Sequence, residues 1–429
     1  MRKRMLTACL LVLTLFLGAL PAGAAEIVKE EDSFKKKTIS ASSENETARY
    51  KASKVTGLKT DRKFSNAVAN ASVLLLQKTL EGEKSGKNIL ISPDSVFTAV
   101  SMVENGAAGK TQKEMKKALG GISVKQYSRY LYTLHRRLTK NRNLKYNVAN
   151  SIWYKKGKIH VKPAYLKKLV SYYGAEVYGA PFKGSTVKDI NNWVYNGTNG
   201  KIPSIIDRLS PAMRMAVINA VYFKANWADP YGSTSKFPFT NGNGKKKKVK
   251  TLVGSERTYV EVNGGTGFVK PYESGKVAFM ALLPPEGTSA EAFVKGLTGT
   301  KLINAYRKRK KSGVIVRTRM PEFKYSYSVS LNKPLQKMGM KTAFTRTADF
   351  SKMTKNPVCV DEILHKTFID VNKEGTEAAA VTAVMMKASS AYMPEIEIRE
   401  VFLDRPFVYA IVDVSSGIPL FLGITNDVK

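Results

Sequence analysis

The sequence is poor in cysteine and in histidine. Its 429 residues include two cysteines, Cys9 and Cys359, and three histidines, His135, His160 and His365. Cys9 lies in an N-terminal apolar stretch, so a chain that loses this stretch keeps one thiol, which cannot form an internal disulfide. We therefore expect core packing alone to hold the fold together, and we expect no cysteine catalysis. We also expect no metal site and no cofactor.

Acidic residues are also scarce. The chain has 34 Asp and Glu residues against 70 Lys and Arg residues, which gives a formal net charge of +36. Such an excess creates a long-range positive field that attracts polyanions, such as nucleic acid, glycosaminoglycan, teichoic acid or an anionic membrane. The charge does not define the fold, but a hydrophobic fraction of 43% is enough for a large core in one or two domains.

Long apolar runs are confined to the N-terminus. Residues 1–24 have the pattern of a secretory signal peptide: a basic start, an apolar stretch from Leu6 to Leu20 and the small residues Ala22-Gly23-Ala24. The length of the apolar stretch leaves an uncleaved anchor as the alternative. Residues 25–60 are rich in Lys, Glu, Ser and Thr, which predicts a flexible polar leader. We expect a secreted, extracellular protein with no membrane span after signal removal and a folded domain over residues 61–429.

Helical patterns come early in the chain and strand patterns come late. Apolar residues follow helical spacing from Phe64 to Leu80, Ser92-Pro93 marks a second helix start, and Thr111 with Glu114 has capping-box spacing. Short apolar runs predict strands at Ala216–Phe223, Val277–Leu283, Val314–Met320 and Phe407–Val414. This order predicts an α+β fold with large antiparallel or mixed sheets.

Six groups of residues, in order along the chain, resemble the serpin family. The most specific is Gly375-Thr-Glu-Ala-Ala-Ala-Val-Thr-Ala383, which is similar to the hinge of the family's reactive-centre loop. The others are similar to helices B, C and F, a central strand of sheet A and the two closing strands: Asn88–Ser95 with Gly106–Thr111, Asn191–Val194 with Thr198–Ile202, Asn219–Lys224 with Trp227, Asp404–Phe407, and Pro419–Gly423. The resemblance implies a single-domain serpin fold with three β-sheets, about nine helices and an exposed reactive-centre loop, here at about residues 374–393.

The resemblance is to inhibitory serpins, and it implies a monomeric suicide inhibitor of serine-type proteases rather than an enzyme. The protease cuts the loop, and the cut loop inserts into sheet A as an extra strand while the protease is still held as a covalent acyl-enzyme. A non-inhibitory serpin that binds a polyanion or a polyanionic surface is the alternative.

The hinge composition suits burial in a sheet. Alternate side chains of a strand face the same way, and the set that would face inward is small or apolar: Thr376, Ala378, Ala380, Thr382, Val384 and Met386. The predicted hinge consists of Lys373, Glu374, Gly375, Thr376, Glu377, Ala378, Ala379 and Ala380. Gly375 supplies backbone freedom where the loop folds over. An ordinary helix over Ala378–Ala380 is the alternative.

Two further groups are assigned by the resemblance. The hinge departs from the family pattern at Lys373, where an acidic residue is usual, and Glu322 stands where the basic partner is usual, so we expect a reversed ion pair between them. Together with Trp227, Glu322 marks the breach, where sheet A opens. The resemblance also places Ser92, Ser95, Asn219 and His365 in a hydrogen-bonded shutter cluster beneath sheet A. A serine hydrolase is a poor alternative because the chain lacks a Gly-x-Ser-x-Gly elbow.

Family spacing places the scissile bond between Ser389 and Ser390, which would suit elastase-like or subtilisin-like proteases. A shift of one or two residues changes the target class: Lys387 would attract a trypsin-like protease, and Met386 or Tyr392 a chymotrypsin-like one.

The basic residues form three groups. Lys125, Arg129, Arg136 and Arg137 lie on a predicted helix that resembles helix D, where some relatives bind heparin-like polyanions, and the first three can share one face. The other two are the runs Lys245–Lys248 with Lys250, and Arg307–Lys311. The expected partners are thus a serine-type protease and a polyanion such as a heparin-like glycan or a cell-surface polymer. A merely solvated face is the alternative for the helix.

Overall fold

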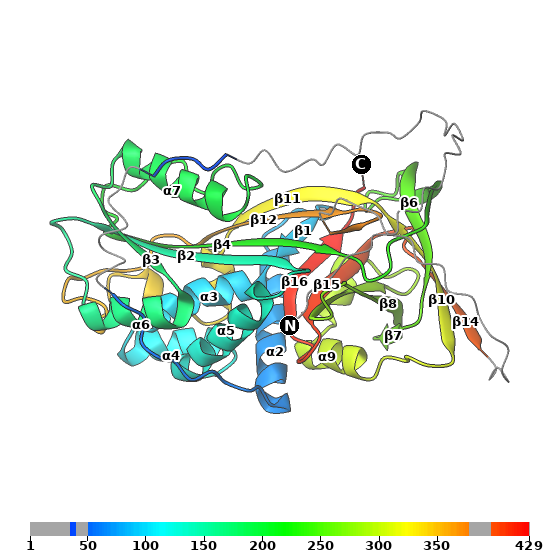
Figure 1. Cartoon of the computed structure of the whole chain (residues 1–429), viewed down its shortest axis with the longest axis horizontal. Coiled ribbons are helices and arrows are strands. Elements are labelled where there is room, and N and C mark those ends of the chain that lie inside the picture. Colours follow the sequence, from blue (N-terminus) through cyan, green and yellow to red (C-terminus); the bar gives the residue numbers. More distant parts are fainter. Residues whose placement is uncertain (1–34, 40–49, 377–395, 429) are drawn as a thin grey trace, which may run out of the picture. The chain divides into compact units, whose positions relative to one another are not determined.

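The computed structural model describes residues 35–39, 50–376 and 396–428. Residues 36–429 form one compact unit, and its described part contains nine α-helices and three β-sheets (Figure 1). The predicted α+β class and number of sheets are confirmed. The predicted signal peptide lies outside the described residues, and none of the described helices is both long and apolar enough to cross a membrane.

Six of the nine described helices end before residue 200, and most described strands follow it, as predicted. They are α2 (Arg62–Leu80), α3 (Pro93–Glu104), α4 (Gly109–Ala118), α5 (Val124–Thr139), α6 (Pro163–Tyr173), α7 (Gly184–Gly197), α8 (Ala290–Lys295), α9 (Gly299–Arg307) and α10 (Asn332–Lys337). The start predicted at Ser92-Pro93 is confirmed, because the Ser92 side chain caps α3 by accepting the N–H of Ser95 and Pro93 occupies the first turn.

The start predicted at Thr111 is wrong, because α4 begins at Gly109. The Thr111 hydroxyl instead accepts the backbone N–H of Asp349 at 2.9 Å. Glu114 accepts the backbone N–H of Thr342 at 2.6 Å rather than closing a capping box. Tertiary contacts therefore use both side chains that the local pattern assigned to the cap.

Three sheets contain the strands. Sheet A has the order β11 (Phe323–Ser330), β12 (Leu364–Val371), β13 (Gly375–Thr376), β4 (Met215–Asn226), β2 (Lys145–Lys155) and β3 (Glu176–Ala180). Sheet B has the order β1 (Ile89–Ile91), β16 (Pro419–Thr425), β15 (Phe407–Asp413), β9 (Val277–Leu283), β8 (Gly265–Pro271) and β7 (Tyr259–Val262). Sheet C has the order β14 (Glu397–Phe402), β10 (Val314–Pro321), β6 (Lys246–Glu256) and β5 (Ser233–Thr240). All four strands predicted from apolar runs are present.

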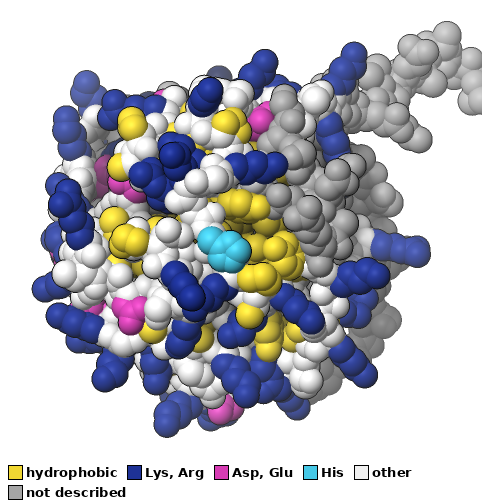
Figure 2. Space-filling view, turned by 90° about the vertical axis from the view of Figure 1, so that its left-hand side faces the viewer, with side chains coloured by type: hydrophobic (Ala, Val, Ile, Leu, Met, Phe, Trp, Pro, Cys, Tyr) yellow, Lys and Arg dark blue, Asp and Glu magenta, His cyan; other side chains and the backbone are white. Residues whose placement is uncertain are grey.

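Helices cover both faces of sheet A. Figure 1 shows α7 on one face and α3, α5 and α6 on the other. A small core joins α7 to β2 and β3, where Trp153 stacks on Tyr178 with ring centroids 4.0 Å apart, next to the buried Trp193. The larger core lies between the other helices and sheet B, whose strands β9, β15 and β16 are buried along their whole length. Figure 2 shows that Lys and Arg side chains outnumber acidic ones on the face it presents.

Candidate functional site: an open strand position in sheet A

In sheet A, the described residues fill one strand position only at one end. The two residues of β13 pair with both neighbours, since Thr376 lies opposite Val371 of β12 and Ala225 of β4. Beyond β13, the described residues form no ladder between β4 and β12, and each strand pairs only on its far side, with β2 and β11. We call this open position the slot. No ladder of the described residues joins its two edges, and an added strand could pair with both of them.

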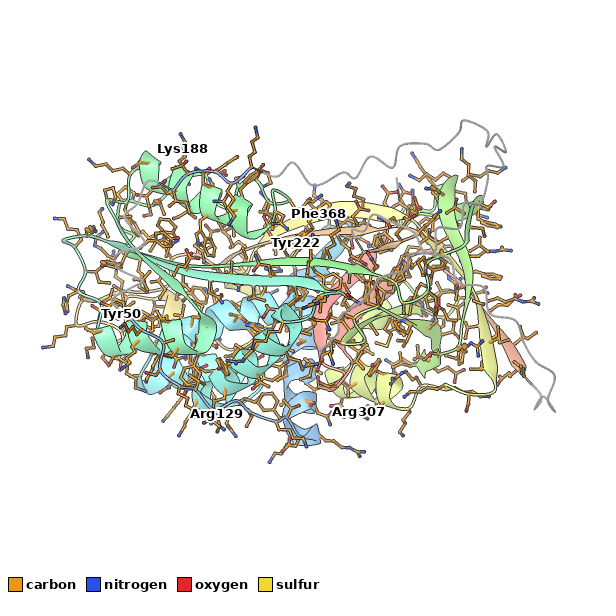
Figure 3. All side chains as sticks on the ribbon, viewed as in Figure 1. Tyr50, Arg129, Lys188, Tyr222, Arg307 and Phe368 are labelled. Atoms are coloured by element: carbon orange, nitrogen blue, oxygen red, sulfur yellow. The ribbon has the colours of Figure 1, made fainter. Side chains whose placement is uncertain are left out.

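A cavity of about 540 Å³ lies at the foot of the slot. Its wall combines apolar residues from both edges, such as Val217 and Ile363, with the polar Ser95 and His365. Higher in the sheet, Tyr222 of β4 and Phe368 of β12 lie in the middle of sheet A (Figure 3). The foot of the slot is therefore lined by both apolar and polar groups.

Gly375 is required by the close approach of β4. A Cβ atom at this position would lie 2.3 Å from the carbonyl oxygen of Ala225 and 2.8 Å from Cα of Asn226. Neither is a side-chain atom that could swing away. The neighbouring Thr376 is buried, and its hydroxyl lies 2.6 Å from the Tyr272 hydroxyl. The hinge predicted from the sequence thus begins inside the sheet.

Trp227 and Asn372 hold the turn that precedes β13. The backbone N–H of Trp227 donates to the carbonyl oxygen of Glu374 at 2.9 Å, and its indole N–H donates to the carbonyl oxygen of Asn372 at 3.0 Å. The Asn372 side chain accepts the N–H groups of Glu374 and Gly375. Trp227 also stacks on Tyr272 with ring centroids 4.5 Å apart. The predicted breach residue Trp227 is therefore in direct contact with the hinge.

The expected ion pair between Lys373 and Glu322 is not formed. Nζ of Lys373 lies 3.8 Å from the carboxylate of Glu374, and Glu322 pairs instead with Lys250, with 2.9 Å between Nζ and Oε2. The reason is strand adjacency. Glu322 directly follows β10, and its backbone N–H donates to the carbonyl oxygen of Lys250 in the neighbouring strand β6 at 2.9 Å.

We expect Gly375→Val to expel β13 from sheet A, because the new Cβ would collide with the Ala225 backbone. Hydrogen exchange should show the loss as a fall of about tenfold or more in the protection of the amides at residues 375–376. Gly232→Val is the matched control, because a Cβ at Gly232 meets nothing within 4 Å. Unchanged protection in the Gly375 variant would contradict the tight fit.

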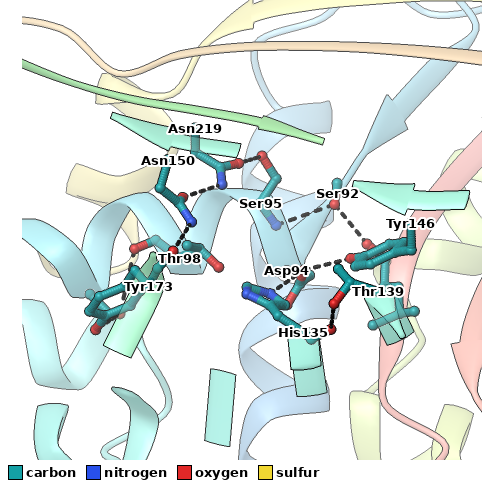
Figure 4. Close-up of polar contacts among 12 residues, drawn as sticks. Ser92, Asp94, Ser95, Thr98, His135, Thr139, Tyr146, Asn150, Tyr173 and Asn219 are labelled. Atoms are coloured by element: carbon teal, nitrogen blue, oxygen red, sulfur yellow. Dashed lines mark hydrogen bonds and ion pairs between the residues drawn. The ribbon is translucent and has the colours of Figure 1, made fainter. Parts of the chain in front are cut away.

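The four predicted shutter residues meet beneath the slot. The Ser92 N–H donates to Nε2 of His365 at 3.0 Å, and the Ser92 hydroxyl donates to the carbonyl oxygen of Leu420 at 2.9 Å. The Ser95 hydroxyl donates to the side-chain carbonyl of Asn219 (Figure 4). Burial lowers the pKa of His365 to about 4, so the ring is neutral at physiological pH and accepts the Ser92 N–H. Since His365 contacts the Ser92 backbone and not a hydroxyl, these residues do not form a hydrolase relay.

Sequence reasoning missed two extensions of this cluster. Asn219 donates to Asn150 of β2 at 2.8 Å, and Asn150 donates to the carbonyl oxygen of Tyr173 at the end of α6. On the other side, Asp94 in the first turn of α3 accepts the Tyr146 hydroxyl at 2.6 Å and lies 2.9 Å from Nε2 of His135 on α5 (Figure 4). No spacing in the sequence relates these positions, because the partners come from separate elements that only folding brings together.

The predicted basic face of α5 is partly engaged within the protein. Arg129 donates to the carbonyl oxygens of Thr56 and Gly57 at 2.9 and 2.7 Å, and Arg137 donates to the buried carboxylate of Asp413 at 2.5 Å. Residues 56 and 57 belong to the predicted leader, which therefore contacts α5 here. Arg136 lies against its neighbour Tyr132, while Lys125 is exposed. Binding of a polyanion to α5 stays a prediction.

The remaining predicted loop residues lie outside the described part of the chain. They are Glu377, Ala378, Ala379, Ala380, Met386, Lys387, Ser389, Ser390 and Tyr392.

Comparison with known proteins establishes the family. The family model described as serpin (serine protease inhibitor) matches residues 67–428. An uncharacterized serpin-like protein of Thermococcus kodakarensis is 32% identical over 83% of this chain and 84% of its own, and the leukocyte elastase inhibitor of Sus scrofa is 30% identical over 81% and 95%. The crystal structure of the thermophilic serpin tengpin in its native state has a TM-score of 0.82 at 37% identity and covers 90% of this chain and all of its own. The chain belongs to the serpin family.

Proposed function

We propose that this serpin is a secreted suicide inhibitor of serine-type proteases. The observation that carries the proposal is the slot in sheet A: the hinge residues Gly375 and Thr376 are paired at its upper end, and below them no described strand separates β4 from β12. The signal-peptide pattern of residues 1–24 supports secretion.

The register of β13 predicts where each loop residue would lie after insertion. Gly375 and Thr376 face Asn226 and Ala225, and Thr376 also faces Val371, so each further loop residue steps one position back along both β4 and β12. Ala378 would then lie opposite Phe223 and Ile369. Thr382 would lie opposite Asn219 and His365, and Val384 opposite Val217 and Ile363. These positions are predictions for the inserted state.

The side chains of the inward set match these neighbours. Ala378 would enter a place bounded by two large buried side chains, Phe223 and Ile369, where only a small residue fits. Thr382 would bring a hydroxyl to the polar shutter cluster, which can pair with it. Val384 and Met386 would enter the cavity at the foot of the slot, where Val217 and Ile363 offer apolar contacts. The composition of the loop is therefore compatible with the slot at each of these positions.

Insertion of the loop would trap the protease after the acyl-enzyme has formed. The serine of the protease attacks the carbonyl carbon of Ser389, the peptide bond to Ser390 breaks, and the amine of Ser390 leaves with a proton while Ser389 stays bound as an ester. The freed strand gains backbone hydrogen bonds on both edges of the slot. Its insertion would carry the ester-linked protease away from the loop's original position before water cleaves the ester.

We expect a covalent complex that survives SDS when the protein is mixed with a protease that cuts the loop. Elastase, subtilisin, trypsin and chymotrypsin should be tested in parallel, with active-site-blocked protease as the control. The mass of the released C-terminal peptide identifies the bond: it begins at Ser390 for the predicted site, at Ala388 for cleavage after Lys387 and at Met393 for cleavage after Tyr392. Clean cleavage by every protease without any complex would contradict inhibition and favour the non-inhibitory alternative.

A further inference from the structure

The guanidinium group of Arg319 lies between two phenylalanine rings on sheet C. Arg319 belongs to β10, and its Cζ atom lies 4.0 Å from the ring centroid of Phe237 on β5 and 4.2 Å from that of Phe402 on β14. Because β5 and β14 are the two edge strands of sheet C, the rings reach Arg319 from opposite edges of the sheet. Contact with the two rings holds the flat guanidinium group in one orientation.

The N–H groups of Arg319 have no acceptor among the described residues, although the side chain is half-buried. Each of the other described arginines that lie over a ring donates a hydrogen bond to an oxygen atom, as in the pairs Arg136–Tyr132, Arg309–Tyr306 and Arg399–Glu397. The two ring contacts could serve to join the edge strands, but that role uses the faces of the guanidinium group. It leaves five N–H donors at the edge of the group, where an anion can bind.

Arg319 also lines a pocket of about 130 Å³ on sheet C. Most of the described residues in its wall are apolar: Phe237, Pro238, Phe239, Val249, Phe402 and Leu403. A cavity of about 150 Å³ can hold a benzene ring, so this pocket suits one planar ring that stays partly exposed. Among the described residues of the wall, Asp404 is the one carboxylate, and Arg405 already pairs with it at 3.0 Å.

We infer that this pocket binds a small aromatic carboxylate. The ring would lie against the apolar wall, and the two carboxylate oxygens would accept hydrogen bonds from two N–H groups of Arg319, which is the bidentate geometry that a guanidinium group favours. A phosphate or sulfate ion could accept the same hydrogen bonds but would leave the apolar wall in contact with water. A neutral ring would leave the cation without a partner. The wall and the cation together therefore select an anion with an apolar body.

The position of the pocket connects the two edges of sheet C. Its wall contains residues of β5, β6, β10 and β14, and Figure 1 shows β6, β10 and β14 at the same end of the molecule. Strand β14 is the first described strand after the predicted loop. A bound carboxylate would therefore link this strand to the opposite edge of the sheet.

Isothermal titration calorimetry of the full chain with benzoate tests the inference. Benzamide has the same ring without the charge, acetate has the carboxylate without the ring, and inorganic phosphate is an anion without an apolar body. Arg319→Gln removes the cation, and Arg319→Lys keeps the charge but lacks the planar pair of donors. Arg317→Gln is the matched control, because Arg317 lies two positions earlier on the same face of β10 and pairs with Glu400 at 3.4 Å.

We expect the unaltered protein to bind benzoate at least about tenfold more tightly than benzamide, acetate or phosphate, because each of these lacks either the charge or the ring. Arg319→Gln should weaken benzoate binding by about tenfold or more, and Arg319→Lys should weaken it as well. Arg317→Gln loses the same charge but should keep the affinity within about twofold, since an exposed charge outside the pocket contributes little.

Four results would overturn the inference. They are no binding of benzoate by the unaltered protein, equal affinity for benzoate and any of the three comparison ligands, equal losses in the Arg317→Gln and Arg319→Gln variants, and full affinity in the Arg319→Lys variant. Equal losses would mean that the general field of the +36 chain attracts the anion. The inference does not depend on protease inhibition, so either one can fail without the other.

Discussion

Replacing Thr376 by arginine is expected to turn the proposed inhibitor into a substrate. Thr376 is 2% exposed, and its hydroxyl meets that of Tyr272 beneath the stacked ring of Trp227. An arginine there would have to bury its charge among aromatic rings without a carboxylate partner, which costs several kcal/mol. The arginine would therefore expel β13 from the sheet of the uncut protein, and insertion of the cut loop would have to bury the charge and would be slower than hydrolysis of the acyl-enzyme.

Two measurements check this expectation. The fraction of cut molecules that form an SDS-stable complex should fall by about tenfold or more, since each 1.4 kcal/mol of added barrier is a factor of ten in rate, while the rate of loop cleavage should stay the same. Thr376→Ser is the matched control, because it keeps the hydroxyl and adds no charge, and it should trap protease normally. Undiminished trapping by the arginine variant would refute insertion through the slot, whatever the target protease is.

Replacing Glu104 by glutamine is expected to remove a loss of stability that occurs as the pH rises. Glu104 ends α3 with 1% of its surface exposed, and neither carboxylate oxygen has a hydrogen-bond partner in the described structure. Burial raises the pKa of this carboxyl to about 8 from its ordinary value of 4.5, against a smaller opposite effect of Lys116 and Lys352. The folded protein therefore holds a proton that the unfolded chain releases.

The sign of the effect follows from this difference in bound protons. Below pH 4.5, Glu104 is protonated in both the folded and the unfolded state, so it does not change the stability. Between pH 4.5 and about 8, Glu104 ionises in the unfolded chain but stays protonated in the folded protein, so the free energy of unfolding falls as the pH rises. The total loss is on the order of a few kcal/mol, since one unit of pKa shift corresponds to about 1.4 kcal/mol. The glutamine of the Glu104→Gln variant cannot ionise, so this variant should not lose stability in this way as the pH rises.

Urea unfolding at pH 5, 7 and 9 measures the difference. The free energy of unfolding of the Glu104→Gln variant relative to the unaltered protein should increase between pH 5 and pH 9. Glu286→Gln, which changes an exposed glutamate in a turn, is the control and should follow the unaltered protein. If the two variants had the same pH profile, the buried carboxyl would not carry a raised pKa.

Features encoded within a few neighbouring residues could be predicted from the sequence. The start of α3 is an example, since Ser92 caps the helix that Pro93 opens. The hinge is another, because the alternation of small residues from Thr376 onward depends only on the two-residue period of a strand. The order of the family motifs was sufficient for the fold, which the three sheets and the family match confirm.

Features that depend on which strands become neighbours could not be predicted. The carboxylate of Glu322 forms an ion pair with Lys250 because strand β10 pairs with strand β6. The two residues are far apart in the sequence. Likewise, Asp94, His135 and Tyr146 meet only because α3, α5 and β2 pack together beneath the slot. Strand pairing and helix packing bring together residues that are far apart in the sequence, so the spacing of neighbouring residues does not predict them.

The sequence by itself determined the family, and it predicted the hinge and the inward-facing set of loop residues, because each of these is a local pattern of side-chain size and charge. The tertiary structure decided that Gly375 and Thr376 of the hinge are already paired in sheet A, that no described strand fills the slot beneath them, and which carboxylates and carbonyl groups the basic residues contact. The physical reason is that an ion pair or a strand pair is specified by distance in space. The sequence shows Arg129, Arg137 and Lys250 only as basic residues, and the structure shows which group each of them contacts.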